Sequence, residues 1–139
     1  HLQDAIGGGR LTRFHLEAEI AAIHASAPTW DATDWDRIVA AYDKLLAVEP
    51  SPVVELNRAV AVAERDGPVA GLAALQPLAL HPELERSPWY HATRARLLRN
   101  GGHPEPARAA WSRALELTEA GPAREFLTRE RDTPTPVAP

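Results

Sequence analysis

Arginines gathered in one segment of the chain offer the clearest chemistry for binding. Arg96 and Arg99 follow Trp89 in what we predict to be a single helix, so they project from neighbouring turns of it. A guanidinium donates charge-assisted hydrogen bonds to a carboxylate, which suits recognition of an acidic peptide group. The alternative is that these arginines are solvated and paired with the chain's many glutamates. In the first interpretation, a protein-binding surface is formed by Asn57, Arg58, Trp89, Arg96 and Arg99.

The amide of this group, Asn57, falls inside an apolar segment between Leu56 and Ala59. A buried asparagine must find hydrogen-bond partners. We predict that its side chain bonds to the backbone of a neighbouring loop, with a direct binding role as the second option.

The sequence does not predict a metal centre or a catalytic site. Asp34 and Asp36 lie near His24, but helix capping and charge in a first helical turn explain them better than a calcium loop does. The chain has no cysteine, which excludes thiolate–metal sites and thiol nucleophiles. It also lacks a Gly-x-Ser-x-Gly elbow and a His-Glu metal motif. We therefore predict no cofactor, no metal and no enzymatic activity.

Helical signals separated by turn residues fill the chain between residues 12 and 131. Leu16, Ile20 and Ile23 recur with helical spacing. The Ser-Pro pairs at 51–52 and 87–88 have the cap-then-proline pattern that begins a helix. Because no β-branched segment alternates with a period of two, we predict an all-α fold without a sheet.

An internal repeat of 36 residues organises these helices. Its identities are Ser51/Ser87, Pro52/Pro88, Arg58/Arg94, Ala59/Ala95, Pro68/Pro104, Ala73/Ala109 and Ala74/Ala110. Residues 87–121 also fit the tetratricopeptide pattern, with Ala95 and Ala107 at the small positions where paired helices approach closely. We predict a tetratricopeptide-like array of three helical hairpins and a capping helix, with an irregular helical bundle as the alternative. The predicted hairpins span 12–48, 52–80 and 88–119, and the capping helix spans about 122–131.

The two ends of the chain differ in composition from this helical domain at 12–131. Residues 1–11 contain three consecutive glycines with no strand before them, so we predict a linker and not a phosphate-binding loop. Residues 132–139 are rich in proline and are predicted to form a disordered tail. We expect the chain to be part of a longer protein, since it contains no methionine.

Net charge and hydropathy argue against two classes of binding partner. The formal net charge of −4 argues against a phosphate-binding face for nucleic acid. No apolar run approaches the length that spans a membrane, and the start of the chain has no signal-peptide pattern. We therefore expect neither DNA nor a membrane as a direct partner of this chain.

Several runs of the sequence occur in a characteristic order, at residues 18–25, 33–35, 42–46, 50–63, 66–68 and 71–72. The most specific is Pro-Ser-Pro-Val-Val, followed by Leu-Asn-Arg-Ala-Val-Ala. Together these runs resemble the C-terminal extension of a group of extracytoplasmic-function RNA polymerase sigma factors. The resemblance implies a cytoplasmic, tetratricopeptide-like regulatory domain of a sigma factor. The implied partners are the upstream sigma regions of the same chain, RNA polymerase or a regulatory protein.

Two other functions remain open at the level of sequence. The chain could be a stand-alone adaptor that binds peptides in its groove, because repeat arrays present extended concave surfaces. A helical domain that binds a small molecule is the third hypothesis, and it belongs to a different functional class.

Overall fold

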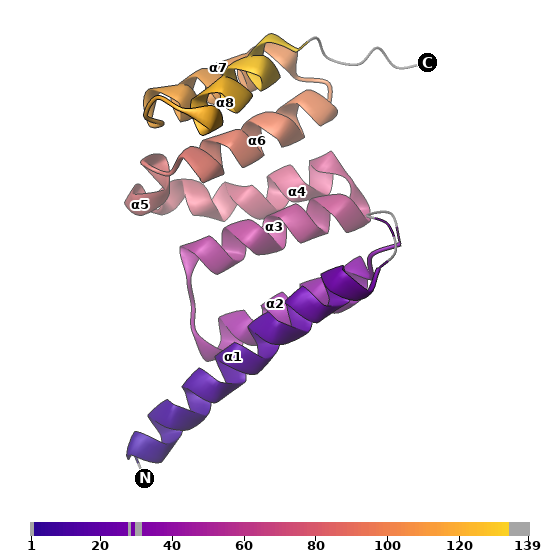
Figure 1. Cartoon of the computed structure of the whole chain (residues 1–139), viewed down its shortest axis with the longest axis vertical. Coiled ribbons are helices and arrows are strands. Elements are labelled where there is room, and N and C mark those ends of the chain that lie inside the picture. The colour runs from indigo at the N-terminus through magenta and orange to yellow at the C-terminus, as the bar shows by residue number, and fades with distance from the viewer. Residues whose placement is uncertain (1, 28, 30–31, 134–139) are drawn as a thin grey trace.

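The computed structural model describes residues 2–27, 29 and 32–133, which form a stack of helices (Figure 1). The elements are α1 (Leu2–Ser26), α2 (Trp35–Val48), α3 (Pro52–Asp66), α4 (Pro68–Leu75), the 3-10 helix η1 (Gln76–Leu80), α5 (Pro82–Glu85), α6 (Pro88–Asn100), α7 (Pro104–Glu116) and α8 (Pro122–Asp132). No strand occurs in these described ranges. The predicted all-α fold is therefore confirmed.

Successive helices pair into hairpins that stack in layers (Figure 1). Helix α1 packs on α2, α3 packs on α4, and α6 packs on α7, while α8 covers α7 at the C-terminal end. The short elements η1 and α5 lead from the second hairpin to the third. This arrangement is the predicted tetratricopeptide-like array, and the second and third hairpins lie within the predicted ranges 52–80 and 88–119.

The Ser-Pro pairs begin helices as the sequence predicts. The Oγ of Ser51 accepts a hydrogen bond from the backbone N–H of Val54 at 3.4 Å, and the Oγ of Ser87 accepts one from Tyr90 at 3.3 Å. Proline then occupies the first helical position, where its missing N–H leaves no hydrogen bond unmade. These caps set the same starting point for α3 and α6, one repeat apart.

Glycine makes the second hairpin tight in two ways. Gly67 ends α3 and starts α4 with a φ of +99°, a conformation that favours glycine, so one residue turns the chain. Gly71 then lies so close to α3 that a Cβ placed on it would be 2.5 Å from the Cβ of Ala63. The absence of a side chain at Gly71 therefore lets α3 and α4 pack in direct contact.

The small residues of the third hairpin are also buried. Ala95 is fully buried and Ala107 is 2% exposed, and both belong to one apolar cluster with Trp111 between α6 and α7. This burial confirms the predicted role of the two alanines as close-packing positions.

The first helix begins earlier than the sequence predicts. The sequence predicts a linker at residues 1–11, but α1 runs from Leu2 and includes the three glycines. Glycine costs about 1 kcal/mol relative to alanine inside a helix, but it can adopt helical backbone angles. The N-terminal part of α1 extends past the stack in Figure 1. At the other end α8 continues to Asp132, and the rest of the predicted tail lies almost entirely outside the described residues.

None of the helices in the described ranges is both long enough and apolar enough to cross a membrane.

Candidate functional site

Three of the five predicted binding residues come together in one hollow. Asn57 of α3 and Trp89 and Arg96 of α6 line it, and helices α1 and α2 complete its wall. We call this site the aromatic hollow; its volume is about 220 Å³. Its lining residues are His24, Trp35, Ile38, Tyr42, Asn57, Val60, Ala61, Trp89 and Arg96.

The wall of the aromatic hollow is held by contacts between rings and polar groups. The indole Nε1 of Trp89 donates a hydrogen bond to the Oδ1 of Asn57 at 3.3 Å, which ties α6 to α3. The ring of His24 meets Trp35 edge to face with centroids 5.3 Å apart. Burial raises the pKa of the Tyr42 phenol above its ordinary value, since the charged form loses hydration there. The hollow is therefore a partly dehydrated, aromatic environment.

The bond between Trp89 and Asn57 corrects one prediction. The sequence predicts that Asn57 bonds to the backbone of a neighbouring loop, but its side-chain oxygen accepts from a side chain of the next hairpin. The reason is the stacking of hairpins, which places the first helices of successive repeats side by side. Sequence spacing alone does not show which face of one helix meets the next.

Arg58 and Arg99 do not join the predicted surface. The Nε of Arg58 donates to the Oδ1 of Asp43 at 2.7 Å, which anchors α3 to α2. Arg99 forms a 2.7 Å ion pair with Glu130 of α8, and its guanidinium carbon lies 5.6 Å from the centroid of the Trp111 ring. Both arginines therefore hold helices together, and the solvated-pair alternative describes Arg58 well.

Arg96 differs from these two arginines. It makes no ion pair within the described part of the chain, and its side chain lines the aromatic hollow. A guanidinium without a carboxylate partner keeps all its N–H donors available to a ligand. Arg96 is thus the cation of this site that remains available for binding.

A second hollow, which sequence reasoning missed, shares Trp89 with the first. It lies where α6, the end of α7 and α8 meet, has a volume of about 440 Å³, and we call it the apolar hollow. It is lined by Pro88, Trp89, Ala92, Leu117, Thr118, Glu119, Ala123, Phe126 and Leu127. Trp89 is 50% exposed and Phe126 is 49% exposed, so two large rings border it. The sequence signal that could have indicated this hollow is Phe126 in the predicted capping helix. An aromatic residue at that position indicates packing, so it did not suggest a binding surface.

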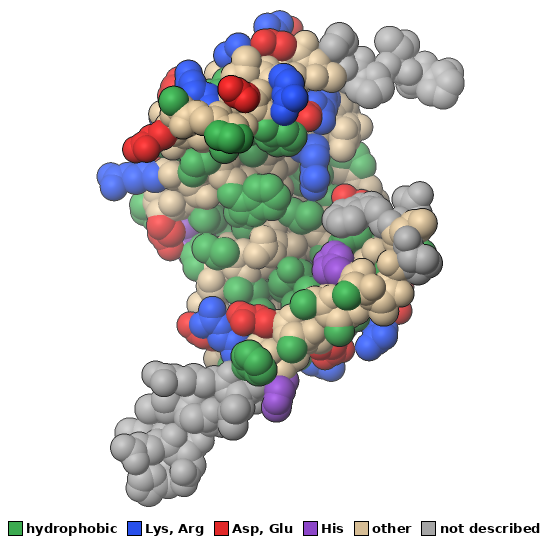
Figure 2. Space-filling model, in the orientation of Figure 1, with side chains coloured by type: hydrophobic (Ala, Val, Ile, Leu, Met, Phe, Trp, Pro, Cys, Tyr) green, Lys and Arg blue, Asp and Glu red, His purple; other side chains and the backbone are tan. Residues whose placement is uncertain are grey.

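Hydrophobic side chains cover the middle of one face of the molecule, as Figure 2 shows. They spread over α3 and α6, while charged side chains gather toward α8 above them and near α1 below them. Of the apolar side chains of these two helices, Val53 is 55% exposed and Trp89 is 50% exposed. Contiguous exposed apolar patches rimmed by polar residues often mark surfaces that bind other proteins.

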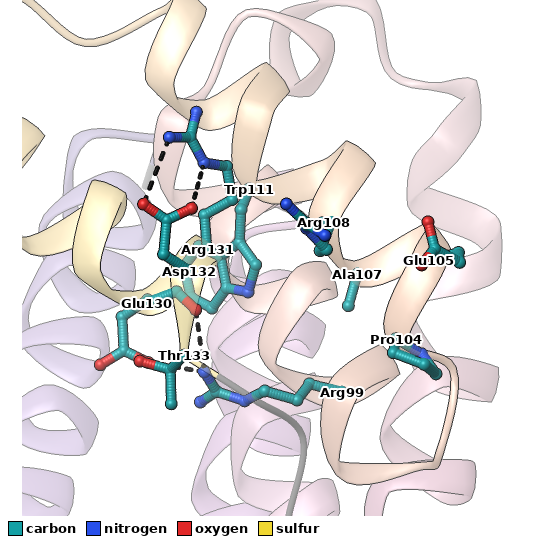
Figure 3. Close-up of a pocket in the computed structure, with 10 residues that line it drawn as sticks. All are labelled: Arg99, Pro104, Glu105, Ala107, Arg108, Trp111, Glu130, Arg131, Asp132 and Thr133. Carbon is teal, nitrogen blue, oxygen red and sulfur yellow. Dashed lines mark hydrogen bonds and ion pairs between the residues drawn. The ribbon is translucent and has the colours of Figure 1, made fainter.

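A third cleft, with a volume of about 370 Å³, lies between α6, α7 and α8, and several of the charged side chains that line it pair with one another (Figure 3). Arg99 bonds to Glu130 there, and Arg131 bonds to Asp132. The hydrogen bond from Arg131 holds the pKa of the Asp132 carboxyl below its ordinary value. The buried indole Nε1 of Trp111 has no acceptor among the described residues. Because its charges are largely paired with one another, this cleft joins α8 to the third hairpin.

Among the residues that the structure describes, no three His, Asp or Glu side chains are grouped so that they could hold a metal ion.

Comparison with known proteins finds a relative of the chain. The chain is 40% identical over 119 residues to an uncharacterized protein of Rhizobium meliloti (strain 1021). The match covers 86% of this chain and 28% of that protein, so the chain spans little more than a quarter of the relative's length. No family model matches the chain. No solved structure matches it either.

Proposed function

We propose that this chain is the C-terminal regulatory and protein-docking domain of an extracytoplasmic-function sigma factor that acts in transcription initiation. The observation that carries the docking role is Arg96, a cation without an ion-pair partner in the described chain, beside Trp89 in an aromatic hollow. The assignment to a sigma factor is supported by the residues of the resemblance. Its most specific run, at 50–63, forms most of α3 and contributes Asn57 to that hollow.

The partners in this proposal are proteins. The domain docks in the cytoplasm on the upstream sigma regions of the same chain, on RNA polymerase or on a regulatory protein. It does not contact DNA itself, because a net charge of −4 supplies no phosphate-neutralising surface. It carries out no reaction and needs no cofactor. In the relative from Rhizobium meliloti the matching segment is a minor part of a longer protein, as expected for one domain among several.

The first test measures transcription from the longer sigma factor with and without residues 12–131. We expect deletion of the domain to change the amount or the regulation of promoter-specific transcription in a reconstituted reaction with RNA polymerase. Full and normally regulated transcription from the truncated protein would contradict the proposal.

The second test titrates promoter DNA against this chain alone at physiological salt. We expect no sequence-selective binding, since phosphate contacts supply most of the non-specific affinity of DNA-binding proteins. Tight and selective binding by the chain would replace the docking role with a DNA-binding one.

A further inference from the structure

We infer that the docking partner presents a short acidic segment, with an apolar side chain in the apolar hollow and a carboxylate about three residues away on Arg96. The inference rests on the proposed docking function and deepens it by stating the chemistry of the segment that binds. It depends on the volumes, the charges and the spacing of the two hollows.

The two hollows adjoin at Trp89, which lines both of them, and we call the two together the groove. The aromatic hollow, at about 220 Å³, is smaller than the roughly 300–1,000 Å³ of most small-molecule sites, so it suits one amino-acid side chain. The apolar hollow, at about 440 Å³, has room for a large aliphatic or aromatic side chain between Trp89 and Phe126. A peptide that places one residue in each hollow fits this pair of hollows.

Charge determines which end of the peptide is acidic. Arg96 lines the aromatic hollow and has no ion-pair partner in the described ranges, whereas the carboxylate among the lining residues, Glu119, borders the apolar hollow. A ligand carboxylate is therefore attracted at the aromatic hollow and repelled at the other end. The hydrogen bond that Asn57 already accepts from Trp89 leaves its amide N–H groups as further donors to such a carboxylate.

Helix geometry determines the spacing between the two ligand groups. Trp89, Ala92 and Arg96 lie on one stripe of α6; Ala92 lines the apolar hollow and Arg96 lines the aromatic hollow. Seven residues of α-helix rise about 10 Å. A peptide in the polyproline II conformation advances about 3.1 Å per residue with three residues per turn, so an apolar side chain and a carboxylate about three residues apart lie on the same side and span this distance.

The test begins with a phage-displayed library of random peptides selected on the whole immobilised chain at physiological salt. We expect enriched peptides to share an apolar residue and an Asp or Glu about three positions apart. A consensus without an acidic residue, a basic consensus or no enrichment at all would overturn the inference.

One enriched peptide, made synthetically, is then measured by fluorescence anisotropy against paired variants. Arg96→Glu should weaken its binding by about tenfold or more, because a charge-assisted bond is replaced by repulsion. Arg94→Glu is the matched control: Arg94 is exposed on the same helix but about 200° away from Arg96 around its axis, so binding should stay within about twofold. Equal binding by wild type and Arg96→Glu would overturn the inference.

The apolar contact has its own pair of variants. Phe126→Ala should weaken the same peptide, whereas Val69→Ala, at a side chain that is 75% exposed and lines neither hollow, should not. Circular dichroism checks that each variant keeps its helices. Phe126 is half exposed, so its truncation tests binding more than folding.

Reversal of both charges supplies the decisive arm. A peptide with Lys in place of its acidic residue should bind Arg96→Glu more tightly than it binds the wild-type chain. Failure of this reversal would overturn the pairing with Arg96. Sedimentation of the chain alone would also overturn the inference if it showed a dimer that Trp89→Ala abolishes, because a second copy would then occupy the groove.

These outcomes are distinguishable from those of the proposed function. If the library shows no acidic preference but removal of residues 12–131 still alters transcription, docking in transcription stands and the inferred peptide chemistry fails. If acidic peptides bind through Arg96 and the truncated sigma factor is fully regulated, the groove is correct and the role in transcription is wrong.

Discussion

The second and third hairpins share their buried positions and differ on their exposed face. Residues 36 apart are buried in both: Ala59 and Ala95, Val62 and Leu98, Gly71 and Ala107, Leu75 and Trp111, and Leu78 and Ala114. On the exposed face the equivalents of Val53 and Val60 in α3 are Trp89 and Arg96 in α6. The repeat therefore preserves packing, while of these two hairpins the third contributes the aromatic ring and the cation that line the groove.

A second difference between the two hairpins is the element that covers each of them. Ala63 of α3 contacts Gly71, but its equivalent in the third hairpin is Arg99, which pairs with Glu130 of α8. In the second hairpin this position lies at the contact between its own helices α3 and α4, and the next hairpin covers α4. The third is covered by a single helix, and Arg99 attaches that helix by an ion pair. One repeat position thus serves packing in one hairpin and capping in the next.

The largest loss of stability is expected at the equivalent repeat positions Leu75 and Trp111, which are each 3% exposed. Trp111→Ala should destabilise the fold by about 3–5 kcal/mol because it leaves a large cavity. Leu75→Ala should cost about 2–5 kcal/mol for the same reason. Urea unfolding followed by circular dichroism measures both. A loss below about 1 kcal/mol at either site would show that the two hairpins do not share this core position.

The next largest loss of stability is expected where two helices pack in close contact. Ala95→Leu should cost about 1–3 kcal/mol by overpacking a fully buried site between α6 and α7. Gly71→Ala should also destabilise, since the new Cβ would lie 2.5 Å from that of Ala63 and α3 and α4 would have to separate. Ala73→Leu, at an exposed position of α4, is the control. An unchanged melting temperature for Ala95→Leu would refute the assigned register.

The attachment of α8 by Arg99 should contribute less to the free energy of unfolding. Arg99→Gln removes the ion pair to Glu130 and the contact with the Trp111 ring, at about 1 kcal/mol in total. Arg94→Gln, on the exposed side of the same helix, should stay within about 0.5 kcal/mol of wild type. Hydrogen exchange should quicken in α8 first. If the two variants behaved alike, capping of the third hairpin would not depend on Arg99.

The smallest effect concerns pH at the end of α8. The pKa of Asp132 lies below its ordinary value of 3.8 because Arg131 hydrogen-bonds to the carboxylate. A carboxyl whose pKa is lower in the folded chain stabilises the fold at pH values above its ordinary pKa. That contribution is lost as the pH falls through the pKa of the folded state. NMR titration should place the Asp132 midpoint below 3.8, and Arg131→Gln should return it toward that value. An unchanged midpoint in that variant would remove Arg131 as the cause.

The structure brings together only some of the residues that the sequence predicts for the binding surface. Residue type singled out Asn57, Trp89 and Arg96, which the structure brings together. It could not separate Arg96 from Arg58 and Arg99, because all three guanidinium groups look alike until their carboxylate partners are placed. The partial exposure of Phe126 escapes prediction for a similar reason: an aromatic residue in a capping helix is usually buried, and its exposure depends on where α8 lies.

Local chemistry is what the sequence by itself determined. Ser-Pro caps, glycine turns and the 36-residue spacing of small residues specify where helices begin, end and touch, since each acts through neighbours in the chain or in the same hairpin. Tertiary structure alone decided how the hairpins stack and where the last helix docks. Those contacts join residues far apart in sequence, such as Trp89 with Asn57 and Arg99 with Glu130. Tertiary structure also places carboxylates beside Arg58 and Arg99. No carboxylate of the described chain pairs with Arg96, so its guanidinium remains available for binding.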